Sequence, residues 1–266
     1  MTLYSQGQLE EWLVFARELV TESRALLAAG RDWSSQFKPD RTLVTELDLE
    51  IEQKLRERIL RRYPDHGVLG EEFGARQRDA EWLWVLDPID GTASFMAGMP
   101  VYGTLIALLH QGVPVLGVID QPATDDCWIG RQGLPTLWFR RDGGRECRTR
   151  ACASLEQAFV SVSSPDFFLP DERPVWQGFC ERTGWRVYGG ACRSYGLLAS
   201  GRTDLALDAG LKLYDFAAMR PIIEGAGGVI SDWEGRAITL DSGSRVLAAG
   251  DAARHREALE LIQRLA

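Results

Sequence analysis

The chain has 266 residues, of which 45% are hydrophobic and 26% are charged, and its formal net charge is −8. This length and composition are ordinary for one large packed domain, and they exclude a mainly disordered chain. The acidic balance and the lack of a long basic block argue against nucleic acid or an anionic membrane surface as the main partner. An acidic protein that handles an anionic substrate needs cations at its site.

The five cysteines are odd in number and form no C-x-x-C pair, so the sequence suggests neither a disulfide framework nor a zinc knuckle. We expect reduced thiols. Residues 1–6 lack a basic region followed by an apolar core, and no stretch approaches 18 uninterrupted apolar residues. We therefore expect a cytoplasmic protein that is not exported and does not span a membrane.

The first 62 residues show helical periodicity. Apolar residues at helical spacing predict an amphipathic helix over residues 7–28. A second helix is predicted after Thr45, because Ile51, Leu55 and Ile59 recur every four residues. The polar segment 36–42 between the helices is predicted to be a loop. The charged residues expected on the solvent side of the second helix are Glu50, Glu52, Lys54, Arg56, Arg58 and Arg61.

From residue 68 onward the pattern changes to that of strands. The predicted strands are 82–86, 102–109, 115–119 and 127–129. The turns at 110–114 and 121–125 are short, which favours an antiparallel meander. The segment Asp142-Gly143-Gly144 marks another hairpin.

After about residue 150, strands and helices alternate, which is typical of α/β layers. The predicted strands are 158–162, 185–188 and 204–207, and the predicted helices are 174–182, 192–199 and 215–226. Pro221 is expected to kink the last helix. No linker separates the halves, so we expect one unit, 1–266, with an N-terminal α+β sublobe (1–150) and a C-terminal α/β sublobe (151–266).

Two carboxylates and a glycine turn follow the strand at 82–86. In the hexapeptide Asp87-Pro88-Ile89-Asp90-Gly91-Thr92, a buried strand is expected to end and a helix to begin. Ligands of α/β proteins collect beyond the carboxyl ends of strands, where a helix N-terminus presents free N–H groups to an anion. We therefore expect Asp87 and Asp90 to hold cations, and the Gly91 and Thr92 amides to hold phosphate. Two ordinary turns in succession are the alternative.

Three further acids stand beside element ends, and each has a simpler explanation on its own. Glu71 fits a solvated surface acid, Asp215 fits a helix cap, and Asp48 fits a capping box with Thr45. These three acids together with the hexapeptide favour a metal site over the separate explanations, because Mg²⁺ requires several convergent carboxylate oxygens.

The acids divide into metal ligands and catalytic groups. Glu71, Asp87 and the Ile89 carbonyl would hold one Mg²⁺, and Asp87, Asp90 and Asp215 would hold a second. Such a pair neutralises the phosphate, steadies the leaving oxygen and lowers the pKa of the water that attacks. Asp48 and the Thr92 hydroxyl would orient and deprotonate that water. The predicted catalytic residues are Asp48, Glu71 and Thr92.

Taken together, the motifs resemble the magnesium-dependent, lithium-sensitive inositol monophosphatase family. They are Leu43-Val44-Thr45-Glu46-Leu47-Asp48, Gly70-Glu71-Glu72, the hexapeptide 87–92 and Tyr214-Asp215, in that order. The match spans nearly the whole chain. It implies a layered αβαβα sandwich of the inositol monophosphatase and fructose-1,6-bisphosphatase type, usually a homodimer, with two or three Mg²⁺ ions and inhibition by Li⁺. It also implies that Lys38 lies near the phosphate.

Within that family, three segments look most like the histidinol-phosphate phosphatase branch: 103–110, 117–122 and 211–216. Ala93 and Ala191 depart from the pattern, since that branch often has a basic and an acidic residue there. Asp208 matches the family position that touches the organic part of the substrate, and Gly190 and Ala191 are further substrate contacts. A surface Asp at a strand end is the alternative for Asp208. We predict hydrolysis of histidinol phosphate, with inositol 1-phosphate or another sugar or nucleotide phosphate as the alternative.

Two other classes of protein fit parts of the pattern. Asp90-Gly91-Thr92 ends the D-x-D-G-T signature of haloacid-dehalogenase-type phosphatases, whose first Asp is a covalent nucleophile. Here Pro88 occupies that position, and the first acid is displaced to Asp87. A cation-binding module without catalysis would be supported by a missing catalytic residue, and none is missing. We therefore predict an enzyme, a phosphoric monoester hydrolase.

Overall fold

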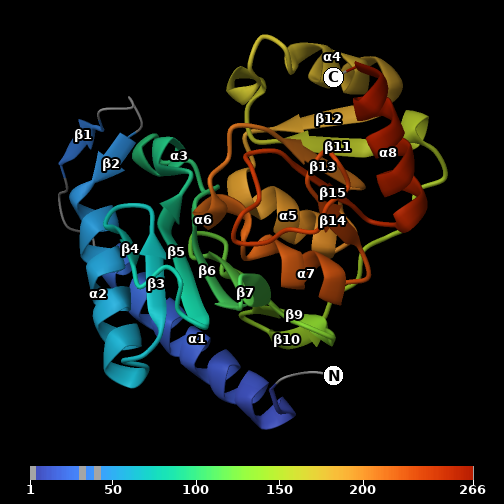
Figure 1. Ribbon diagram of the computed structural model, residues 1–266. Helices are drawn as coiled ribbons and strands as arrows, with labels where there is room; N and C mark the ends of the chain where they lie inside the picture. Colours follow the sequence, from blue (N-terminus) through green and yellow to red (C-terminus); the bar gives the residue numbers. More distant parts are fainter. Residues whose placement is uncertain (1–3, 30–33, 39–42, 266) are drawn as a thin grey trace.

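The structure, a computed structural model, describes residues 4–29, 34–38 and 43–265. Its elements stack in the order helices, sheet, helices, sheet, helices (Figure 1). The larger sheet ends at Glu146, and the smaller one begins at Phe159. The predicted αβαβα sandwich is confirmed.

Two long helices form the first layer, on one face of the larger sheet. They are α1 (Gln6–Ala28) and α2 (Glu46–Arg62), and both were predicted. Between them, β1 (Ser35–Phe37) and β2 (Leu43–Thr45) pair antiparallel. The predicted loop 36–42 is therefore wrong at its start, where backbone pairing with β2 produces a strand. Residues 39–42 of that loop lie outside the described residues.

Helix α2 buries the face that carries its apolar repeat. Ile51, Leu55 and Ile59 are fully buried, as their spacing predicts. The expected position on the solvent side is wrong for Glu52, which is 0% exposed, and for Arg56, whose side chain is mostly buried. The Glu52 carboxylate is tolerated inside because Arg56 and two backbone N–H groups of a distant turn donate hydrogen bonds to it.

The strands of the larger sheet are β3 (Gly67–Gly70), β4 (Gly74–Arg76), β5 (Trp82–Asp90), β6 (Gly103–His110), β7 (Val113–Gln121), β8 (Asp126–Arg131), β9 (Leu134–Arg140) and β10 (Gly143–Glu146). They lie in the order β10-β9-β8-β7-β6-β5-β3-β4. Strands β5 to β10 pair antiparallel in succession, which confirms the meander and the hairpin at 142–144. Strands β3 and β5 run parallel, so their carboxyl ends meet at one edge.

A layer of helices separates the two sheets: α5 (Ala191–Ala199), α6 (Leu213–Phe216) and α7 (Met219–Gly225). The smaller sheet has the order β12-β11-β13-β15-β14, with β11 (Phe159–Val162), β12 (Trp185–Tyr188), β13 (Leu205–Asp208), β14 (Val229–Ser231) and β15 (Val246–Ala249). Helices α4 (Arg173–Arg182) and α8 (Ala252–Leu265) cover its outer face. Two 3₁₀ turns flank β11: η1 (Leu155–Gln157) and η2 (Pro165–Phe167).

The single helix predicted over 215–226 is wrong, because the segment forms two helices, α6 and α7. Pro221 lacks the N–H that would bond to the Ala217 carbonyl, and the break falls at Ala217 and Ala218. Pro221 itself is the third residue of α7, where a missing N–H has little cost, so the expected kink becomes a break one turn earlier.

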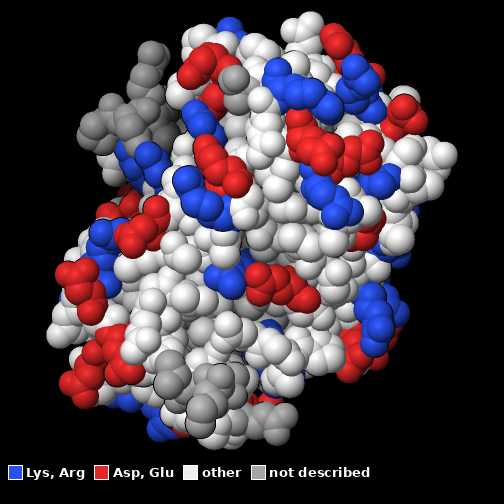
Figure 2. Space-filling view, turned by 45° about the vertical axis from the view of Figure 1, so that its right-hand side comes forward, with Lys and Arg blue, Asp and Glu red and all other residues white. Residues whose placement is uncertain are grey.

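Charges of both signs are interspersed on the face shown in Figure 2, and the described residues of that face form no large patch of one sign. All five cysteines are free, and the described residues contain no disulfide. No helix in the described part of the chain combines the length and apolar character needed to cross a membrane.

Candidate metal centre

Three aspartates converge where β5 ends. Asp87 and Asp90 lie in the last residues of β5, and Asp215 lies in α6, which packs against β5. Each offers a carboxylate oxygen, and these three oxygens lie within 4.8 Å of one another. Folding therefore brings together three of the four side chains predicted to bind metal, although Asp215 is remote in sequence.

Asp87 lies at the centre of this group without a complete set of partners. It is 1% exposed, and its Oδ1 accepts no hydrogen bond from the described residues. Burial raises the pKa of Asp87 well above its ordinary value, and the charges of Glu71, Asp90 and Asp215 raise it further. A divalent cation would offset this repulsion, and carboxylate oxygens are the ligands that Mg²⁺ prefers. The residues present fit Mg²⁺.

Backbone N–H groups hold the other two aspartates. The N–H of Cys192, at the start of α5, donates to Oδ2 of Asp90 over 2.6 Å, and the N–H of Lys212 donates to Oδ2 of Asp215 over 2.6 Å. Burial raises the pKa of Asp90, and the hydrogen bond from Cys192 opposes that rise. Lys212 is the N-cap of α6, so the capping role of Asp215 is compatible with a place in the acidic group.

Glu71 lies beside the three aspartates and outside their tight group. Its N–H donates to the Leu86 carbonyl over 3.2 Å, which places it next to Asp87 on the neighbouring strand. Lys38 Nζ donates to Glu71 Oε1 and to Glu72 Oε1, each over 2.8 Å. Burial lowers the pKa of Lys38, but the two hydrogen bonds outweigh it, and the net pKa is raised. In the structure, Lys38 is therefore paired with Glu71 and Glu72.

Asp48 completes the acidic surroundings from α2. Its Oδ2 accepts hydrogen bonds from the N–H of Thr45 over 2.7 Å and from the Thr45 hydroxyl over 2.6 Å, so the capping box is present. Its Oδ1 is buried without a partner among the described residues. Burial raises the pKa of Asp48 to about 6, although the bonds from Thr45 oppose the rise. Asp48 thus has one carboxylate oxygen left to accept a proton near neutral pH.

The turn after β5 has the conformation that its glycine permits. Gly91 has a φ of 82°, and a Cβ on it would lie 3.0 Å from the Val101 carbonyl oxygen. It is the N-cap of α3 (Thr92–Met96), so the helix expected after the hexapeptide is present but has only five residues. The Thr92 hydroxyl donates to the Ile89 carbonyl over 2.9 Å, so the predicted catalytic hydroxyl and the predicted metal-binding carbonyl lie together at the turn.

The predicted substrate contacts lie at two different depths. Gly190 is the N-cap of α5, and Ala191 is its first residue. The Ala191 Cβ would lie 3.5 Å from a Cβ on Gly91, so this helix start adjoins the turn. Asp208 is only 1% exposed, and its oxygens accept from the Ser163 N–H over 2.7 Å and the Tyr195 hydroxyl over 2.8 Å. The surface interpretation of Asp208 is wrong, because both oxygens are engaged inside the protein.

Sequence reasoning missed three residues that support this arrangement: Glu52, Cys192 and Tyr195. A signal for Glu52 was available, since it follows Asp48 by four residues and therefore shares its helix face. Nothing local to Cys192 or Tyr195 points to Asp90 or Asp208, which they meet only in the folded chain.

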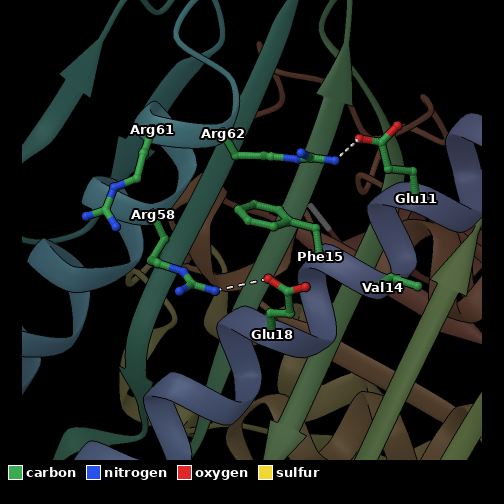
Figure 3. A pocket seen from close by; sticks show the side chains of 7 residues that line it. All are labelled: Glu11, Val14, Phe15, Glu18, Arg58, Arg61 and Arg62. Carbon is green, nitrogen blue, oxygen red and sulfur yellow. Dashed lines mark hydrogen bonds and ion pairs between the residues drawn. The ribbon is translucent and has the colours of Figure 1, made fainter.

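A groove of about 510 Å³ lies elsewhere, between α1 and α2 (Figure 3). Two of the three arginines in this groove are held in ion pairs, Arg62 with Glu11 over 2.8 Å and Arg58 with Glu18 over 3.0 Å. Its lining residues are Glu11, Val14, Phe15, Glu18, Arg58, Arg61 and Arg62, and they include no predicted site residue.

Comparison with known proteins identifies the class. Residues 8–266 match the model of the inositol monophosphatase family. The bifunctional chloroplastic phosphatase IMPL2 of Arabidopsis thaliana is 42% identical over 85% of this chain and 67% of its own. A histidinol-phosphatase of Chlorobaculum parvum is 35% identical over 81% of this chain and 82% of its own. A solved inositol monophosphatase from Zymomonas mobilis superimposes on this chain with a TM-score of 0.85 and is 34% identical. The superposition covers 98% of this chain and 100% of that one.

The fold, the acidic group and these likenesses define a phosphoric monoester hydrolase of a metal-dependent kind. The chain belongs to the inositol monophosphatase family. This membership removes the haloacid-dehalogenase alternative and the cation-binding module without catalysis.

Proposed function

We propose that the protein is a Mg²⁺-dependent phosphomonoesterase that hydrolyses histidinol phosphate by direct attack of water. The observation that carries the proposal is the convergence of Asp87, Asp90 and Asp215 within 4.8 Å at the end of a buried strand. The histidinol-phosphatase among the relatives supports the choice of substrate.

The acidic residues would hold the metal ions. Glu71, Asp87 and the Ile89 carbonyl would take one Mg²⁺, and Asp87, Asp90 and Asp215 would take a second. When bound, Mg²⁺ supplies positive charge that neutralises the phosphate and acidifies water. The Lys38 ion pair must loosen for both Glu71 oxygens to be free, since Lys38 now bonds to one of them.

Asp48 and Thr92 would manage the proton of the attacking water. The free Oδ1 of Asp48 accepts that proton, and a pKa of about 6 suits a base that works near neutral pH. The Thr92 hydroxyl donates to the Ile89 carbonyl, so its oxygen is left to accept a hydrogen bond from water. The Gly91 and Thr92 amides, together with Lys38, would bind the phosphate.

The organic part of the substrate would meet Gly190 and Ala191 at the start of α5. Asp208 could reach it only if Tyr195 or Ser163 released a carboxylate oxygen. The second candidate is inositol 1-phosphate, supported by the likeness to the Zymomonas mobilis enzyme. A homodimer in the cytoplasm, two or three Mg²⁺ ions and inhibition by Li⁺ complete the proposal.

A substrate panel tests this function. Release of inorganic phosphate from histidinol phosphate, inositol 1-phosphate, fructose 1,6-bisphosphate and adenosine 3′,5′-bisphosphate is measured with Mg²⁺ and after treatment with EDTA. We expect the highest kcat/KM for histidinol phosphate and no turnover with EDTA. A higher kcat/KM for inositol 1-phosphate would move the assignment to that substrate. Absence of turnover on all four compounds would contradict the proposal.

A further inference from the structure

A buried carboxylate on α2 is bonded to the turn that carries Glu71. Glu52 follows Asp48 by one helical turn and lies on the same face of α2. Its Oε2 accepts from the N–H of Glu72 over 2.7 Å, and its Oε1 accepts from the N–H of Phe73 over 3.2 Å. Two consecutive amides of the turn between β3 and β4 therefore donate hydrogen bonds to the Glu52 side chain.

Arg56 extends this contact to the other end of the turn. Its Nη1 donates to Glu52 Oε1 over 3.0 Å and to the Gly74 carbonyl over 2.9 Å. The side chain of Arg56 is mostly buried, so the ion pair is shielded from solvent. Glu52 and Arg56 together engage the backbone of residues 72–74.

The neighbouring strand leaves space for the carboxylate. A Cβ on Gly70 would lie 1.9 Å from Glu52 Oε1, so no larger residue fits at position 70 while Glu52 keeps its place. Both neighbours of Glu71 in the chain therefore contact Glu52: Gly70, which must lack a side chain, and Glu72, whose N–H donates to the carboxylate. On its other side, the N–H of Glu71 is bonded to Leu86, next to Asp87.

We propose that Glu52 is a positioning residue that holds the turn 71–74 so that Glu71 faces the three aspartates. The inference rests on the proposed function, in which Glu71 is a metal ligand. Groups that orient a metal ligand without touching the metal commonly change affinity 10–100-fold when they are removed. The role needs the length of the Glu52 side chain as well as its charge, because both amides must be reached at once.

Three substitutions separate position from charge and from mere stability. Glu52→Gln keeps the size of the side chain but turns an NH₂ group toward one of the two N–H donors. Glu52→Asp keeps the charge and shortens the reach by one methylene. Glu57→Gln is the matched control, because Glu57 is a half-exposed acid on the same helix, paired with Lys54.

Isothermal titration with Mg²⁺ at 25 °C measures the Kd, and amide hydrogen exchange reports on residues 72 and 73. For both Glu52 variants we expect a Kd about 10-fold or more above that of the wild type, together with faster exchange at the two amides. Glu57→Gln should change neither. Arg56→Met, which leaves Glu52 in place, should give an intermediate Kd and serves if the Glu52 variants do not fold.

A purely structural role would lower the melting temperature without changing the Kd of the folded protein, and that result would overturn the inference. A wild-type Kd in Glu52→Asp would also overturn it, since charge alone would then suffice. Wild-type protein that hydrolyses phosphomonoesters with Mg²⁺ while every variant binds Mg²⁺ normally would refute only the positioning role. Wild-type protein that binds no Mg²⁺ would refute the proposed function and this inference with it.

Discussion

The backbone N–H of Cys192 donates a 2.6 Å hydrogen bond to Oδ2 of Asp90, although the two residues are 102 positions apart. The bond links the end of β5 in the larger sheet to the first turn of α5 in the middle layer. It fixes the direction of the Asp90 carboxylate, one oxygen of which lies within 4.8 Å of a carboxylate oxygen of Asp87 and of Asp215. The acidic group therefore depends on contact between two layers that fold from different halves of the sequence.

Asp90→Asn should abolish most of the turnover. The substitution keeps the shape of the side chain but removes a negative charge from the proposed cation site. We expect kcat/KM for phosphate release to fall by about 1,000-fold or more, since a proposed direct ligand is lost. Asp142→Asn, an exposed residue of the β9–β10 hairpin, is the control. Activity within a factor of a few of the wild type in Asp90→Asn would exclude Asp90 as a metal ligand.

Lys38→Met should affect metal and substrate in opposite directions. Lys38 Nζ lies 2.8 Å from both Glu71 and Glu72, so it competes with a cation for Glu71. We expect Mg²⁺ to bind several-fold more tightly in the variant, because a partly buried ion pair is worth roughly 1 kcal/mol. The KM for the phosphate substrate should rise, since a cation near the phosphate is lost. Titration calorimetry and steady-state kinetics measure the two effects.

The matched control for that variant is Lys54→Met, a half-exposed lysine on α2 whose carboxylate partner is Glu57. It should leave the Kd for Mg²⁺ and the KM unchanged. Weaker Mg²⁺ binding in Lys38→Met would contradict the competition between Lys38 and the cation.

Ala191→Gly should stabilise the protein. Ala191 has a φ of 45°, in the left-handed region that costs an L-residue roughly 1–2 kcal/mol. Glycine removes this cost but increases the entropy of the unfolded chain, so we expect the free energy of unfolding to rise by about 0.5–1 kcal/mol. Urea unfolding measures it. Ala93→Gly in α3 is the control and should destabilise. A loss of stability in Ala191→Gly would show that the conformation carries no strain.

Periodicity predicts the elements that bring the site residues to one edge, because burial on one face leaves a pattern in the local sequence. The helix α2 and the strand β5 are found in this way, and the acids at their ends follow. Helix α8 was not predicted, although Ala258, Leu261 and Ile262 lie at helical spacing and form its buried face.

The rest of the site depends on contacts that no local pattern encodes. The helix face of Glu52 can be read from its spacing of four residues after Asp48, but its burial depends on the amides of a distant turn, which the local sequence does not show. Pro221 signals an interruption of the helix in the sequence, but the place of the break between α6 and α7, one turn earlier, cannot be read from the apolar periodicity of that segment.

The same limit applies to Asp208, whose burial follows from two partners on other elements. Ser163 and Tyr195 donate to its two oxygens, yet burial outweighs these bonds and raises the pKa of Asp208 from its ordinary 3.8 to about 6. Between these values, the folded state binds the proton more tightly than the unfolded state. Rising pH therefore lowers the free energy of unfolding over this interval, by up to about 3 kcal/mol at 1.36 kcal/mol per pKa unit.

Asp208→Asn removes this titration, so its stability should change less between pH 4 and pH 6 than that of the wild type. At pH 4 the two proteins should be similar in stability, because the neutral acid and the amide can each accept from the Ser163 N–H and donate to the Tyr195 hydroxyl oxygen. By pH 7 the variant should be the more stable of the two, since the wild type then carries a buried charge. Urea unfolding across this pH range measures the difference, and Asp166→Asn, an exposed residue, is the control. Parallel curves for Asp208→Asn and the wild type would mean that Asp208 titrates alike in the folded and unfolded states.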